Sequence, residues 1–112
     1  MEYKIKSRIW IEADNNVLLG EGRVHLLKAI DKEGSLSKAA KSINLSYKKA
    51  WTMIDCVNKS AKKPVTESCI GGKGGGGAIL TEYGKKLIEA FEDINKNCWK
   101  HLDNQIEKIN NL

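Results

Sequence analysis

The chain has 112 residues, of which 41% are hydrophobic, so it can form one small domain with a modest core but not two domains. Its net charge of +5 and pI near 9.1 are compatible with a polyanionic partner. It has no apolar run of membrane-spanning length and no signal-peptide pattern, and its three cysteines lack C-x-x-C spacing, so we expect a cytoplasmic protein without membrane, metal or cofactor.

The first twenty residues predict a β-hairpin. Side chains alternate between apolar and polar from Lys4 to Ala13, as in a strand with one buried face. The sequence Asp14-Asn15-Asn16 is typical of a turn, and residues 17–19 form a short return strand. A first helix is expected over residues 22–32, ended by Gly34.

Two further helices are predicted over residues 36–43 and 47–60, separated by a tight turn. Serines precede each of them as caps, and Asn44 tolerates the left-handed conformation that ends a helix. In the third helix the inward positions at helical spacing are Ala50, Ile54, Val57 and Ala61. The outward positions are Lys48, Lys49, Thr52 and Lys59. A helix pair of this kind, with a basic exposed face on its second helix, predicts a helix-turn-helix.

The positive charge is concentrated in the middle of the chain. Between Lys38 and Gly77 the only acidic residues are Asp55 and Glu67. The lysines of the central segment are Lys38, Lys41, Lys48, Lys49, Lys59, Lys62, Lys63 and Lys73. From Glu82 onward the two signs mix, as on a solvated helix.

Residues 71–77 contain six glycines around Lys73. The P-loop pattern fails, because Gly74 stands where the Mg²⁺-binding hydroxyl is required, and no βαβ unit supports a dinucleotide site. A flexible linker is possible on composition. The strand-like flanks at 65–70 and 78–80 favour a β-hairpin with a glycine-rich tip. Helix, turn, helix and hairpin, with Pro64 before the hairpin, follow the order of a winged helix.

A long helix is predicted from Glu82 to about Asn110, capped by Thr81. Its apolar stripe recurs every three or four residues: Tyr83, Leu87, Phe91, Ile94, Cys98, Leu102, Ile106 and Ile109. A rod of roughly 40 Å, at 1.5 Å per residue, is longer than this small domain can cover. We therefore expect a homodimer, with Leu87, Phe91, Ile94, Cys98, Leu102, Ile106 and Ile109 at the interface.

Four segments together carry a family resemblance. They are residues 34–40 (GSLSKAA), 45–51 (LSYKKAW), 71–78 (GGKGGGGA) and 80–84 (LTEYG). Over about residues 22–91 the chain resembles the DNA-binding domain of the ModE family, the molybdate-responsive transcription regulators. The resemblance implies a winged helix-turn-helix similar to that of LysR-type regulators. Full-length members continue into two oxyanion-binding modules, and we expect this chain to lack them.

The expected architecture is mainly α with small β: a winged helix-turn-helix with a long C-terminal dimerisation helix. It divides into an N-terminal β-hairpin (1–20), the helix-turn-helix with its wing (22–81) and the dimerisation helix (82–112). The expected DNA contacts are Ser35, Ser37, Ser46, Tyr47, Lys48, Lys49, Thr52 and Lys73. For Ser46, a role as helix cap alone is as good an interpretation as a DNA contact. For Tyr47, packing on the helix is as good an interpretation as a DNA contact. Trp51 is expected to pack in the core. Trp10 and Trp99 are assigned to packing, Trp99 at or beside the dimer stripe, and Cys56 and Cys98 are expected to fill apolar space.

The sequence thus predicts a dimeric, sequence-specific regulator that binds double-stranded DNA. An architectural DNA-binding protein, or a DNA-binding subunit that recruits a separate effector-binding protein, are the alternatives. An enzyme is not expected, because no carboxylate pair, nucleophile–base set or metal cluster has a recognisable spacing.

Overall fold

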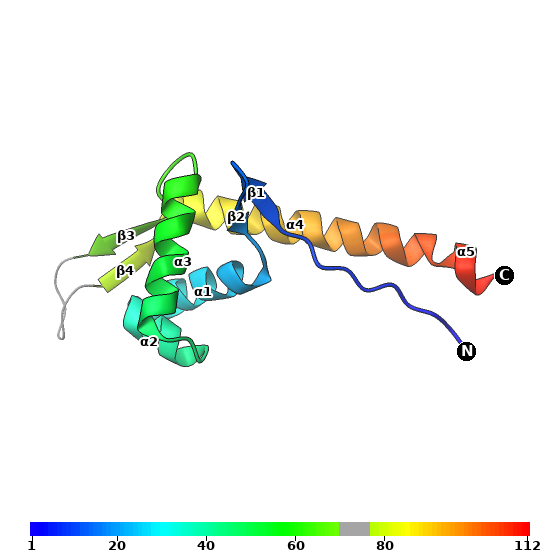
Figure 1. Ribbon diagram of the computed structural model, residues 1–112, viewed down its shortest axis with the longest axis horizontal. Helices are drawn as coiled ribbons and strands as arrows, with labels where there is room; N and C mark the ends of the chain where they lie inside the picture. Colours follow the sequence, from blue (N-terminus) through cyan, green and yellow to red (C-terminus); the bar gives the residue numbers. More distant parts are fainter. Residues whose placement is uncertain (70–76) are drawn as a thin grey trace.

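The computed structural model describes residues 1–69 and 77–112, which form a mostly helical chain with two small antiparallel sheets. In chain order the elements are β1 (Ile11–Ala13), β2 (Asn16–Leu19), α1 (Glu21–Glu33), α2 (Leu36–Ser42), α3 (Tyr47–Ser60), β3 (Thr66–Cys69), β4 (Gly77–Leu80), α4 (Glu82–Gln105) and α5 (Glu107–Asn110). Figure 1 shows α1 to α3 gathered at one end and α4 projecting away from them, so that the molecule measures 61 × 28 × 22 Å. No helix in the described part of the chain is long and apolar enough to span a bilayer.

The N-terminal hairpin is shorter than the sequence predicts. β1 begins at Ile11, not at Lys4, and pairs with β2 across a turn in which Asp14 and Asn15 both have positive φ (49° and 67°). Residues 1–10, here called the N-terminal arm, instead run beside the distal half of α4 (Figure 1). The predicted alternation is real, because the odd positions from 5 to 9 are half-buried and their neighbours exposed. The partner of that face is a helix and not a second strand.

The three helices α1 to α3 begin and end where their caps predict. Gly34 ends α1 with φ 68°. The Ser35 hydroxyl accepts from the Lys38 amide (3.2 Å), and the Ser46 hydroxyl from the Lys49 amide (3.1 Å). Asn44 adopts φ 58°, as expected for the turn between α2 and α3. Each serine cap is worth about 1 kcal/mol of helix stability.

Two clusters of buried side chains form the core. The first joins β2, α1, α3, β4 and α4 through Leu19, Val24, Leu27, Val57, Val65, Leu80, Ile88 and Phe91. The second joins α1, α2 and α3 through Leu26, Ala29, Ile30, Ala39, Ala40 and Ala50. Four of these six residues are alanines, so the three helices pack closely and α3 is held firmly with its opposite face outward.

The strands predicted on either side of the glycine run are confirmed. β3 and β4 pair antiparallel, with Thr66 opposite Leu80 and Cys69 opposite Gly77. The Ala78 amide also donates to the Gly34 carbonyl (3.0 Å), which ties β4 to the junction of α1 and α2. A Cβ at position 77 would lie 2.9 Å from that same carbonyl oxygen, so glycine is required there. Lys73 and the glycines at positions 71, 72 and 74–76 lie outside the described residues.

α4 begins at the predicted cap, where the Thr81 hydroxyl accepts from the Gly84 amide (3.0 Å). The helix does not continue unbroken to Asn110. It ends at Gln105, and a separate turn of helix, α5, follows Ile106.

Candidate nucleic-acid interface

The first two turns of α3 present a polar, basic surface. Lys48, Lys49 and Thr52 are all exposed, as the helical spacing predicts. On the opposite side Ala50 and Val57 are buried, and Ile54 packs against both core clusters. The Thr52 hydroxyl donates to the Lys48 carbonyl (2.9 Å), so its oxygen lone pair and its methyl group remain free to meet a ligand.

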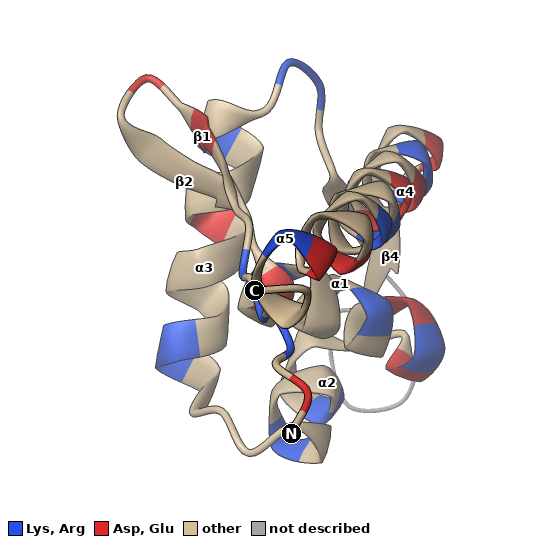
Figure 2. Ribbon diagram, turned by 90° about the vertical axis from the view of Figure 1, so that its right-hand side faces the viewer, with Lys and Arg blue, Asp and Glu red and all other residues tan. Residues whose placement is uncertain are grey.

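Positive charge gathers where α2 ends and α3 begins. Figure 2 shows the lysines of α2 and of the first turn of α3 close together at the lower edge of the view, whereas both signs mix along α4. These lysines are Lys38, Lys41, Lys48 and Lys49, and all four are exposed. Among the described residues none of them forms an ion pair; the ion pairs there are Arg8–Glu21, Lys28–Glu92 and Lys59–Asp55. Their charge is therefore available to an external anion.

One acidic residue stands on the outer side of α3. Asp55 forms an ion pair with Lys59 one turn later, with 2.9 Å between Asp55 Oδ2 and Lys59 Nζ. The hydrogen bond and the negative charge of Asp55 raise the pKa of Lys59. Lys59 is thus partly compensated, unlike the lysines at the other end of the helix.

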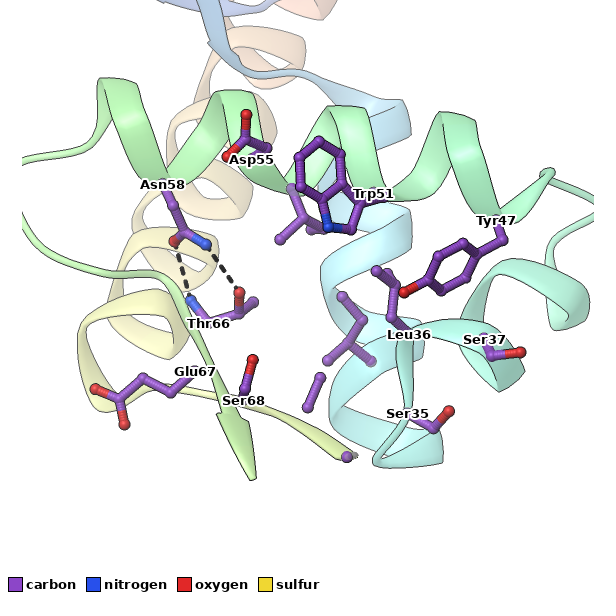
Figure 3. A pocket seen from close by; sticks show the side chains of 14 residues that line it. Ser35, Leu36, Ser37, Tyr47, Trp51, Asp55, Asn58, Thr66, Glu67 and Ser68 are labelled. Carbon is purple, nitrogen blue, oxygen red and sulfur yellow. Dashed lines mark hydrogen bonds between the residues drawn. The ribbon is translucent and has the colours of Figure 1, made fainter. Parts of the chain in front are cut away.

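A groove of about 510 Å³ opens between α3, the N-terminal turn of α2 and the β3–β4 hairpin (Figure 3). Ser35 and Ser37 line it from α2, and Thr66 and Ser68 from β3. From α3 the lining side chains are Tyr47, Trp51, Ile54, Asp55 and Asn58.

Trp51 is not a core residue, contrary to the sequence-based prediction. It is 52% exposed, and Tyr47, one turn earlier, is 56% exposed. At 100° per residue Trp51 stands well away from Ala50 and Val57, so its side chain lies on the groove side of α3 and not on the buried side. Trp10, the last residue of the N-terminal arm, is 55% exposed, so its predicted packing is also wrong. Trp99 is half-buried, with the Lys6 ammonium 5.6 Å from its ring centre.

Asn58 is a structural residue of the site that the sequence analysis missed. Its Oδ1 accepts from the amides of Val65 (2.8 Å) and Thr66 (3.2 Å). Its Nδ2 donates to the Thr66 hydroxyl at 3.0 Å, as Figure 3 shows. These bonds fix β3 to α3 and so hold one wall of the groove. An asparagine in the last turn of a helix, two residues before its end, was the available signal.

The serines predicted to contact DNA first serve the helices. Ser35 and Ser46 use their hydroxyl oxygens as acceptors for helix amides, so Ser46 is the predicted cap, and its contact with DNA stays a prediction. Ser37 is exposed on the first turn of α2. Lys73 lies outside the described residues, so its predicted contact stays a prediction.

The apolar stripe of α4 divides into two parts. Phe91 is 3% exposed and Leu87 packs against the first core cluster, so the structure assigns both to the core of their own chain. Further along, the arm covers one side of the helix. The Tyr3 amide donates to Asn110 Oδ1 (2.8 Å), and Ser7 Oγ lies 4.0 Å from Cys98 Sγ. Ile106 is buried, whereas Ile94 and Ile109 remain 52% and 48% exposed.

Among the described residues no group of three or more His, Cys, Asp or Glu side chains could hold a metal ion. All three cysteines are free thiols. The arrangement therefore offers a basic helix face and a groove, and it shows no metal-centre geometry within those residues.

Comparison with known proteins identifies the relatives of this chain. It is 36% identical over 106 residues to the molybdenum transport protein ModE of Azotobacter vinelandii, which covers 95% of this chain and 39% of that protein. It is 46% identical over 70 residues to the DNA-binding transcriptional dual regulator ModE of Escherichia coli K12, covering 62% of this chain and 27% of the relative. The chain is a homologue of the ModE proteins.

The relationship extends to a second group of proteins. The molybdenum-pterin-binding protein MopB of Rhodobacter capsulatus is 42% identical over 92 residues, which is 82% of this chain and 34% of MopB. The chain thus spans well under half the length of these ModE and Mop relatives. No protein-family model matches the chain.

Proposed function

We propose that the chain is a dimeric, sequence-specific DNA-binding transcription regulator of the ModE type. In this proposal α2 and α3 form a helix-turn-helix, and α3 enters the major groove. The β3–β4 hairpin, extended by residues 70–76, acts as a wing against the backbone or the minor groove. Contacts are assigned to Ser35, Ser37, Ser46, Tyr47, Lys48, Lys49, Thr52 and Lys73.

The observation that carries the proposal is the set of four exposed, uncompensated lysines on α2 and α3. Lysines that neutralise phosphates release counterions, which is the main source of affinity for DNA. The printed name of the Escherichia coli relative, a DNA-binding transcriptional dual regulator, supports the same assignment. Because this chain spans 27% of that protein, the activity is a proposal for this chain and not an inherited property.

The dimer is proposed to form through the distal part of α4. Phe91 and Leu87 belong to the core of one chain, so the interface narrows to the stripe from Ile94 to Ile109. Two copies related by a two-fold axis would place their α3 helices in half-sites one helical turn, or a multiple of it, apart.

The test compares two double variants with the same net charge. Lys48→Ala/Lys49→Ala removes two lysines from the proposed interface, and Lys85→Ala/Lys86→Ala removes two exposed lysines from α4. A binding site is first selected from a random pool of duplex DNA, and affinities are then measured against salt concentration. If each lysine contacts one phosphate, the interface variant should reduce the slope of log K against log salt by about 1.8 per chain. The α4 variant should leave that slope unchanged.

The alternatives give different outcomes in the same experiment. A selection that recovers no preferred site, with tight binding to every sequence, would favour an architectural protein. Equal losses for the two double variants would show that only net charge matters and would overturn the interface. A complex that forms only with a separate effector-binding protein would favour the recruited-subunit role.

Lys73 has its own test. Lys73→Ala should weaken binding to all sequences about equally, because a wing lysine on the backbone carries no sequence information. Unchanged affinity at low salt would remove Lys73 from the interface.

A further inference from the structure

Trp51 and Tyr47 form an exposed aromatic pair on the groove side of α3. Trp51 follows Tyr47 by four residues, so the two side chains come from successive turns of the same face of α3 (Figure 3). Neither the Trp51 indole N–H nor the Tyr47 hydroxyl makes a hydrogen bond to another described residue. More than half of each side chain is open to solvent.

The fold gains little from this pair. The inward face of α3 is completed by Ala50 and Val57, which are 0% and 1% exposed, and Leu36 and Ile54 form the apolar floor of the groove. Two exposed rings beside an open groove are typical of a surface that is buried on binding, because aromatic residues supply large contact area at low entropic cost.

Charge determines which part of a DNA duplex can meet this pair. At helical spacing of 100° per residue, Lys48 and Thr52 stand outermost, with Trp51 on the groove side and Lys49 on the other. Asp55 and Glu67 line the far end of the groove. Carboxylates repel phosphates, so the backbone should lie along the lysines, and the aromatic side is left for base edges.

From this arrangement we propose that Trp51 is a specificity-determining residue that makes apolar contact with the 5-methyl group of thymine in the major groove. The thymine methyl is the one apolar group that base pairs present in that groove. The proposal rests on the proposed function, since it assumes that α3 enters the major groove.

The experiment uses the full chain and the duplex recovered by selection from a random pool. Affinities of wild type, Trp51→Ala and Trp51→Phe are measured for the selected site and for an unrelated duplex. Trp10→Ala is the matched control, because Trp10 is about equally exposed and lies at the end of the N-terminal arm, outside α2, α3 and the groove. Each thymine of the selected site is then replaced singly by uracil, which removes only the methyl group.

We expect Trp51→Ala to lower affinity for the selected site about tenfold and to change affinity for the unrelated duplex less than about twofold. Trp51→Phe should retain part of the specificity. One uracil replacement should weaken wild type several-fold and leave Trp51→Ala unaffected, because the two changes remove the same contact. Thermal unfolding of the variants should match wild type, since the side chain is exposed.

Two results would overturn the proposal. One is an unchanged ratio of specific to non-specific affinity in Trp51→Ala, and an equal loss on both duplexes would make Trp51 a general contact. The other is uracil sensitivity that persists in Trp51→Ala. If the wild-type chain selects no site, the proposed function fails. If the wild-type chain selects a site and Trp51→Ala prefers that site as strongly, only the role of Trp51 fails.

Discussion

At the scale of single residues, Asn58 shows how one side chain joins two parts of the proposed interface. Val65 is fully buried and Thr66 nearly so, and the backbone amides of both residues donate to the side-chain oxygen Oδ1 of Asn58. Buried amides left without a partner cost more than the bond itself contributes, because they lose their hydration as well.

Asn58→Ala should therefore destabilise the fold by about 2 kcal/mol, as two buried amides lose their acceptor. Asn58→Asp is the matched variant. Its carboxylate still accepts both amides, and the Thr66 hydroxyl can turn to donate, so the loss should be smaller. Urea unfolding followed by circular dichroism measures both. Equal loss in the two variants would show that shape, and not the acceptor oxygen, is what matters.

Gly84 is required by close packing and not by backbone conformation. A Cβ at this position would overlap the Val65 carbonyl oxygen and lie 2.8 Å from Leu80 Cδ1. Gly84→Ala should cost about 2 kcal/mol through strain. Gly22→Ala is the control: it stands in α1 with nothing within 4 Å of the added Cβ, so it should stabilise by about 0.5–1 kcal/mol. The midpoints of thermal unfolding should move in opposite directions.

Asp55 places one negative charge on an otherwise basic face. Asp55→Asn should lower the pKa of Lys59 toward its ordinary value and raise affinity for any duplex, because phosphate repulsion falls. A raised lysine pKa adds stability that is present below the unfolded value and is lost only as pH rises through the higher folded value. The stability that the pair contributes should therefore be constant at neutral pH and be lost only above about pH 10.5. NMR titration tests the change in the pKa of Lys59, and binding assays at neutral pH test the change in affinity for DNA.

At the scale of elements, α4 combines two roles along one stripe. Its first half closes the core through Ile88 and Phe91. Its second half lies beyond the domain and is covered on one side by the N-terminal arm. The helix therefore has an edge, marked by Ile94 and Ile109, that the described residues leave about half exposed.

Ile94→Asp should abolish self-association without lowering the stability of the single chain, because the charge falls on an exposed position of the proposed interface. Phe91→Ala should instead destabilise the single chain by about 3 to 5 kcal/mol. Asn104→Asp adds the same charge at another exposed position of α4 and should change neither property. Analytical ultracentrifugation with thermal unfolding separates these effects. A wild type that stays monomeric at high concentration would contradict the interface.

At the scale of the whole molecule, the basic surface and the projecting part of α4 lie at opposite ends. The uncompensated lysines lie at the end formed by α2 and α3, and the distal part of α4 lies at the other (Figures 1 and 2). Dimerisation at one end would leave the other free, so that two basic surfaces could act on one duplex.

The sequence by itself determined most of the local structure. The caps at Ser35, Ser46 and Thr81, the left-handed Asn44 and the bounds of α3 all follow from short-range hydrogen bonding and helical period, which neighbouring residues suffice to specify. The homology to ModE proteins was likewise present in four short segments. These features depend on residues within a few positions of one another.

The tertiary structure alone decided which apolar faces meet. Residues 4–9 alternate as a strand does, but alternation fixes only that one face is buried, and α4 proved to be its partner. Trp51 is apolar by type yet exposed, because the side of α3 on which it lies faces the open groove and not the core. Helical period specifies which residues share a face, whereas the elements packed beside the helix decide which faces are buried.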